Sequence, residues 1–158
     1  MTHNISMVLV LILALFMSAA AVGQVENAEL DAARAQMQTG RDQIIREDLQ
    51  LSEDELAGFW PIYEQYVSDL SVIRDRKATL VGRFMQAYQG GEFSDEFAVW
   101  LIEENFAIKE AWAEVQKAYV DQFMDVVPAQ AVARFYQLEN KLDAEIDAQL
   151  ALFIPLVE

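Results

Sequence analysis

Residues 51–91 read LSEDELAGFWPIYEQYVSDLSVIRDRKATLVGRFMQAYQGG, and this segment carries a continuous helical pattern. Ser52 can cap a helix, and Glu55, three residues later, can reach back to complete a capping box. Pro61 should kink this helix near its start, and the glycine pair should end it. Steps of three and four residues place one stripe along it, apolar except at Lys77: Leu56, Phe59, Tyr63, Tyr66, Leu70, Ile73, Leu80 and Phe84.

A second segment, residues 94–127, repeats this pattern after the glycine pair. Ser94 can cap its start, and its apolar stripe consists of Leu101, Ile108, Trp112, Val115 and Tyr119. Two antiparallel helices joined at the glycine pair place residues of constant index sum opposite each other, and a sum of 185 sets Tyr66 against Tyr119. The two segments therefore predict a long antiparallel helix hairpin.

Two further helical patterns flank the hairpin. The first, residues 28–47, places Leu30, Ala33, Met37 and Ile44 on one face. The last runs from Pro128 to Pro155, with Phe135, Leu138, Leu142, Ile146, Leu150 and Phe153 on one face. We expect an all-α fold, a long antiparallel helix hairpin with two flanking helices. Two arms alone cannot cover their apolar residues, so the outer helices, a second copy of the chain, or both must pack against them. Because the outer helices also have apolar faces, we expect a homodimer.

The N-terminus resembles an export signal. Residues 7–17 are an unbroken apolar run of signal-core length, too short to span a bilayer, and small residues follow at 18–21. We expect a signal peptide at residues 1–23, a single domain at residues 24–158 and a periplasmic location. Residues 1–6 contain no Lys or Arg, which leaves an uncleaved anchor or a misassigned start as alternatives. No later stretch is apolar enough to span a membrane.

The chain is strongly acidic. Its 158 residues contain 26 Asp and Glu against 11 Lys and Arg, a formal net charge of -15. Nucleic acid and anionic membrane surfaces should be repelled by such a charge. We therefore expect basic protein partners and no nucleic acid.

The chemistry of common active sites is missing from the mature sequence. Cysteine is absent, and the sole histidine, His3, lies in the predicted signal. The usual ligands of transition metals and the usual catalytic bases are thus lacking. We expect no enzyme activity, no metal and no cofactor.

Two pairs of adjacent aromatic residues are the candidate binding site. Phe59 and Trp60 precede the proposed kink at Pro61, and Phe135 and Tyr136 follow the turn at Pro128. Neighbours on a helix point in different directions, so one ring of each pair should leave the apolar stripe. We predict that these four residues bind clients or partners.

One basic patch, Arg74, Arg76, Lys77 and Arg83, has two interpretations. Helix pairing would set Arg74 near Glu110 and Arg83 near Glu103, as structural ion pairs between the two arms. The alternative is a docking patch for an acidic partner.

The start of the hairpin resembles a known motif. Leu51, Ser52 and Glu55 are similar to the Leu-Thr-x-x-Gln motif of exported helical-hairpin proteins of the Spy/CpxP type. A second copy would comprise Val126, Val127 and Gln130, of which only the glutamine matches literally. This resemblance implies a periplasmic homodimer shaped as a curved cradle. It also implies an ATP-independent chaperone or a regulator of an envelope-stress sensor.

The sequence departs from that family in two respects. The family's chaperones use a largely basic concave face, whereas this chain is strongly acidic, and its metal-responsive relatives use histidines, which this chain lacks after the predicted signal. We expect an ATP-independent chaperone-like protein that binds unfolded clients. The alternative is a regulatory subunit that docks a basic envelope sensor domain without protecting clients.

Overall fold

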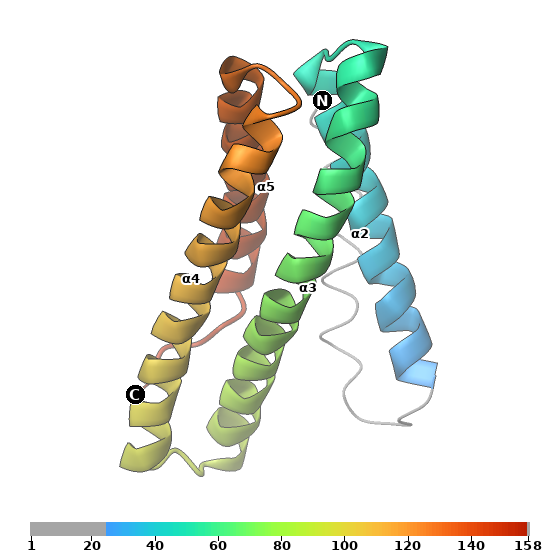
Figure 1. The fold of residues 1–158 in the computed structure, drawn as a ribbon. Helices are drawn as coiled ribbons and strands as arrows, with labels where there is room; N and C mark the ends of the chain where they lie inside the picture. Colours follow the sequence, from blue (N-terminus) through green and yellow to red (C-terminus); the bar gives the residue numbers. More distant parts are fainter. Residues whose placement is uncertain (1–24, 158) are drawn as a thin grey trace. The chain divides into compact units, whose positions relative to one another are not determined.

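The computed structural model describes residues 25–157, and their side chains from residue 32 onward. These residues form four helices and no strand, and 87% of them are helical. The helices are α2 (Val25–Leu49), α3 (Glu53–Gly90), α4 (Asp95–Met124) and α5 (Ala129–Ala151) (Figure 1). The predicted all-α class is confirmed, whereas the predicted signal at residues 1–23 lies outside the described residues.

The chain divides into two compact units. Unit 1 combines the residues up to Gln50, and hence α2, with Arg134–Leu150 of α5. Unit 2 combines Leu51–Ala133, which contains α3, α4 and the first turn of α5, with Ala151 and the residues after it. The single domain expected at residues 24–158 stays a prediction.

Helix α3 begins and ends where the sequence predicts. The Ser52 hydroxyl accepts a hydrogen bond from the Glu55 backbone N–H, and the Glu55 carboxylate accepts one from the Ser52 N–H at 2.8 Å. The helix continues through Pro61. Gly91 ends it with a φ of +66°, a left-handed conformation that glycine adopts without strain.

Helices α3 and α4 run antiparallel within unit 2. The Tyr66 ring lies 5.4 Å from the Tyr119 ring, which confirms the predicted pairing. Near one end Phe59 lies 5.1 Å from Phe123, and near the other Arg83 lies 3.9 Å above the Trp100 ring. The core residues of α3 are Phe59, Tyr63, Tyr66, Leu70, Ile73, Leu80 and Phe84, and those of α4 are Ile108, Tyr119 and Phe123.

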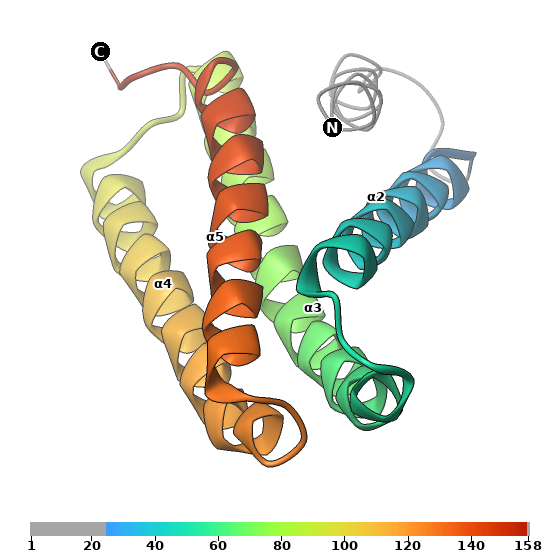
Figure 2. The ribbon, with the colours of Figure 1, turned by 90° about the horizontal axis from the view of Figure 1, so that it is seen from above.

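Helix α2 continues through Gly40 and buries a slightly different face from the predicted one. Ala33, Ile45 and Leu49 are buried, whereas Ile44 is only half-buried. The view in Figure 2 shows α2 and α5 as separate rods. In unit 1, ion pairs of charged side chains join α2 to α5, as described below.

Candidate functional site

The four predicted binding residues are not equivalent. Phe59 and Phe135 are buried, whereas Trp60 and Tyr136 are half-buried. Each pair thus has one ring in the interior and one at the surface, as expected for neighbours on an amphipathic helix. Client binding by these residues stays a prediction, and in this conformation a client can reach only Trp60 and Tyr136.

Trp60 is held by the rings around it. Its indole meets Phe59 edge-on at 5.6 Å and Tyr63 edge-on at 5.0 Å. Edge-to-face pairs of this kind add to the stability that burial alone provides. The partly exposed face of Trp60 is therefore presented on a rigid base in unit 2.

Tyr136 lies in unit 1, 5.1 Å from the Phe135 ring. Burial of its ring and the charge of Glu139 raise the pKa of Tyr136 to about 12. Its hydroxyl stays protonated at neutral pH, so it can donate a hydrogen bond.

A ladder of rings supports Trp60 in unit 2. Phe59, Tyr63, Tyr66, Tyr119 and Phe123 form successive ring contacts between 5.1 and 6.4 Å. The Tyr119 hydroxyl donates to Asp69 Oδ2 at 2.6 Å. Burial and this hydrogen bond raise the pKa of Tyr119 to about 12.

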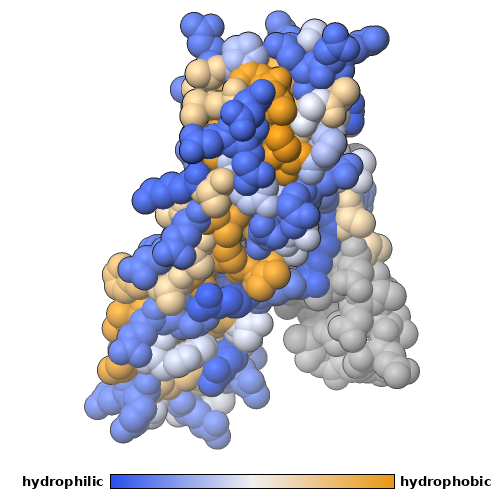
Figure 3. Space-filling model, in the orientation of Figure 1, coloured by the Kyte–Doolittle hydropathy of each residue, from blue (hydrophilic) through white to orange (hydrophobic). Residues whose placement is uncertain are grey.

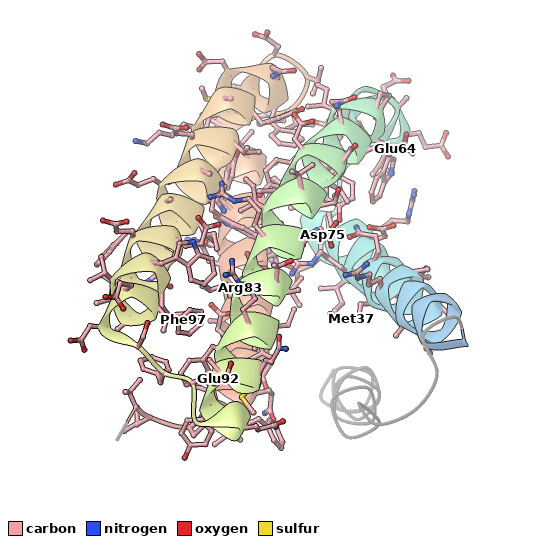
Figure 4. The ribbon with its side chains drawn as sticks, turned by 90° about the horizontal axis from the view of Figure 1, so that it is seen from below. Met37, Glu64, Asp75, Arg83, Glu92 and Phe97 are labelled. Carbon is pink, nitrogen blue, oxygen red and sulfur yellow. The ribbon has the colours of Figure 1, made fainter. Side chains whose placement is uncertain are left out.

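The basic patch on α3 faces α4. Arg76 forms an ion pair with Glu104 at 2.9 Å, while Arg74 and Arg83 lie over the rings of Trp112 and Trp100. Figure 4 labels Arg83 on this side of α3. The Arg76–Glu104 ion pair is of the expected kind, a structural pair between the two helices, whereas the pairs predicted for Arg74 with Glu110 and for Arg83 with Glu103 stay predictions. The negative face of a tryptophan ring attracts a guanidinium group, so an arginine can pair with an uncharged residue. A prediction based only on opposite charges does not include such pairs.

The family-motif residues have structural positions. Ser52 and Glu55 form the capping box, and hydrogen bonds from Ser52 lower the pKa of Glu55. Leu51 is half-buried and Gln130 is exposed in the first turn of α5. Local helix capping accounts for the first motif copy without a ligand.

Unit 1 contains a buried charge cluster that the sequence analysis missed. Arg41 of α2 donates to Glu139 at 2.8 Å and to Asp143 at 2.6 Å, both on α5. Arg41 is 8% exposed and Glu139 is 0% exposed. Burial alone would lower the pKa of Arg41, but the two carboxylates outweigh it and raise that pKa above its ordinary value.

A signal for this cluster was present in the sequence. Arg41 lies four residues after Met37, and Glu139 lies four residues after Phe135, so each is a charged residue within a predicted apolar face. Opposite charges on two apolar faces favour mutual burial, because neither tolerates burial alone. A more exposed pair, Arg134 with Asp48 at 3.0 Å, joins the same two helices.

Unit 2 also exposes large apolar side chains. Val99, Ile102 and Phe106 of α4 are 55%, 58% and 57% exposed. Figure 3 shows hydrophobic side chains at the surface in the lower left part of the view, where α4 is drawn in Figure 1. After α5 the exposed apolar residues are Leu152, Phe153, Leu156 and Val157.

Other kinds of site find little support in residues 25–157. Within this range the Asp, Glu, His and Cys side chains form no group of three that could hold a metal ion. None of the four helices combines the length and apolar character needed to cross a membrane.

Comparison with known proteins adds no relative: no protein-family model, curated protein or solved structure matches this chain. The resemblance to the Spy/CpxP type therefore stays a prediction that depends on the short motif and the helix order.

Proposed function

We propose that this protein is an ATP-independent holding protein that binds unfolded clients and keeps them from aggregating. One observation carries the proposal: large apolar side chains stand exposed on a chain of net charge -15. Full burial of a large apolar side chain contributes about 1.5 to 3 kcal/mol, so a client that covers a half-exposed one gains about half of that. Several contacts of this size give reversible binding, and the net negative charge of the protein keeps the complex soluble.

Trp60 and Tyr136 are the proposed contact residues of the predicted site. Their partly exposed rings present apolar surface to a client. The Trp60 Nε1 atom is itself buried, so the contact that Trp60 offers is apolar. Phe59 and Phe135 hold these rings in place from the interior, because each lies within 6 Å of its neighbour.

The proposal includes export and self-association. The apolar run at residues 7–17 supports a cleaved signal and a periplasmic location. The resemblance to the Spy/CpxP type supports a homodimeric cradle built on the helix hairpin. Mass spectrometry of the exported protein and sedimentation of the mature form test these two points separately.

The direct test is the aggregation of a client protein that unfolds when its disulfides are reduced, followed by light scattering. At an equimolar ratio the mature protein should suppress the scattering. Trp60→Ala and Tyr136→Ala should weaken suppression, while Trp60→Phe, which keeps a ring, should retain most of it. Absence of suppression by the unaltered protein would remove the proposal.

A second candidate is a regulatory subunit that docks a basic sensor domain. The observation that favours it is that Arg74, Arg76 and Arg83 contact side chains of α4. Because these basic groups already have partners within unit 2, the surface offered to another protein is mainly acidic. Ionic strength separates the two functions. Docking through charge weakens steeply as salt rises, whereas holding through apolar contacts persists.

A further inference from the structure

The outer face of α4 carries an apolar stripe, which we define as Val99, Ile102 and Phe106. Their spacing of three and four residues places them on one side of the helix. The residues that α4 buries, Ile108, Tyr119 and Phe123, belong to its opposite side. Each stripe side chain is more than half exposed.

Single exposed apolar residues are ordinary on protein surfaces, but a contiguous row is not. Three large side chains in register cover about two turns of α4. Such a row matches the pattern by which helices present anchors to another chain. The α4 stripe therefore has the form of a docking surface.

Carboxylates border the α4 stripe. Glu103 lies four residues after Val99, and Glu110 lies four residues after Phe106, so both fall beside the stripe. Both are exposed. Lys109, 5.7 Å from the Phe106 ring, is the basic residue next to the stripe.

We propose that the α4 stripe binds short apolar segments of unfolded clients that carry lysine or arginine beside their apolar side chains. Apolar contacts supply the affinity, and Glu103 and Glu110 select basic flanks. This inference rests on the proposed holding function and assigns its client class and a binding surface separate from Trp60 and Tyr136.

Fluorescence anisotropy of labelled peptides tests the inference. The probe is a peptide of leucines flanked by lysines, compared with one in which glutamate replaces lysine and one in which serine replaces leucine. The lysine-flanked peptide should bind most tightly. Its affinity should fall about tenfold or more in Ile102→Ser/Phe106→Ser, since each lost anchor is large and apolar.

Val72→Ser is the matched control, because Val72 is 63% exposed on α3 and lies outside the α4 stripe. It should leave peptide affinity unchanged. Glu103→Gln/Glu110→Gln should weaken binding of the lysine-flanked peptide. It should also reduce the difference in affinity between the lysine-flanked and the glutamate-flanked peptide. Circular dichroism of each variant checks that helicity is retained.

Two results would overturn the inference. One is unchanged peptide affinity in Ile102→Ser/Phe106→Ser while the unaltered protein still suppresses client aggregation, which leaves the holding function standing without this surface. The other is loss of a dimer in that variant at unchanged peptide affinity, which would make the α4 stripe a contact between copies. Failure of the unaltered protein to suppress aggregation would instead remove the holding function itself.

Discussion

Each unit joins two helices, but the two units do so with side chains of opposite character. Unit 2 buries a ladder of aromatic rings between α3 and α4, whereas unit 1 joins α2 to α5 through Arg41, Glu139 and Asp143. Each buried aromatic ring contributes to the free energy of folding through its own apolar area, so the loss of one ring removes only that ring's share. A buried ion cluster depends on all its partners, because removing one of them leaves the remaining charges incompletely compensated in the interior.

Glu139→Ala should therefore give one of the largest effects in the molecule. Arg41 would lose its fully buried partner but keep its ion pair with Asp143, so the expected cost is up to about 3 kcal/mol. We expect faster amide hydrogen exchange in residues 32–49 of α2, measured by mass spectrometry. Exchange in the middle of α3 should change far less.

The matched control is Arg41→Met/Glu139→Leu, which replaces both buried charges by apolar side chains. Such exchanges are often neutral or stabilising, so α2 should regain its protection. Asp143 keeps its hydration because its side chain is 23% exposed. A cost below about 1 kcal/mol for Glu139→Ala would show that the pair behaves like an exposed one.

Phe123→Ala should have a comparable effect on unit 2. The ring is fully buried against Phe59, Tyr66 and Tyr119, and its loss leaves a cavity that costs about 3 to 5 kcal/mol. Urea unfolding followed by circular dichroism measures this cost. Phe106→Ala on the same helix, where the ring is 57% exposed, should stay within about 0.5 kcal/mol of the unaltered protein. Equal effects at the two positions would contradict the burial described here.

The difference between the units also explains what the sequence could predict. Repeated apolar spacing with capping residues at Ser52 and Ser94 is local information, so the bounds of α3 and α4 and the pairing of Tyr66 with Tyr119 were predictable. The burial of Arg41 and Glu139 depends on two charges 98 residues apart meeting across α2 and α5. Each looks like a surface residue until its partner is known.

The candidate site was predictable only in part. Adjacency of two rings on a helix predicts that they point in different directions, but not which one is buried. In both pairs the first ring, Phe59 or Phe135, is the interior one. The α4 stripe of Val99, Ile102 and Phe106 was overlooked because the stronger stripe on the other side of α4 accounted for the helix.

Alkaline pH should act on both units through one tyrosine each. The pKa values of Tyr119 and Tyr136 are raised from 10.0 to about 12, so the folded state holds these protons more tightly than the unfolded chain. The stability that follows is present below pH 10 and is lost as pH rises toward about 12. Absorbance at alkaline pH should show a late ionisation that shrinks in Tyr119→Phe and in Tyr136→Phe.

Neutralising the neighbours should separate the two tyrosines. Asp69→Asn should lower the pKa of Tyr119, and Glu139→Gln should lower that of Tyr136, because each removes a nearby negative charge. Each change should leave the other tyrosine unaffected. A single variant that shifts both ionisations would show that the two sites are coupled.

The smallest expected effect compares two glycines within α3. Gly82 has no heavy atom within 4 Å of the place where a Cβ would lie, whereas at Gly58 that atom would come within 3.1 Å of Val126 Cβ. Alanine is favoured over glycine in a helix by about 1 kcal/mol, so Gly82→Ala should raise the thermal midpoint by a few degrees. Gly58→Ala should gain less or lose stability, because Val126 must move to admit the new methyl group. The double variant Gly58→Ala/Val126→Ala should have a higher thermal midpoint than Val126→Ala alone, because the new methyl group at residue 58 then meets a smaller side chain and part of the helix preference of alanine is recovered. If Gly58→Ala and Gly82→Ala stabilise equally, the turn after α4 does not hold Val126 against α3 as tightly as this contact indicates.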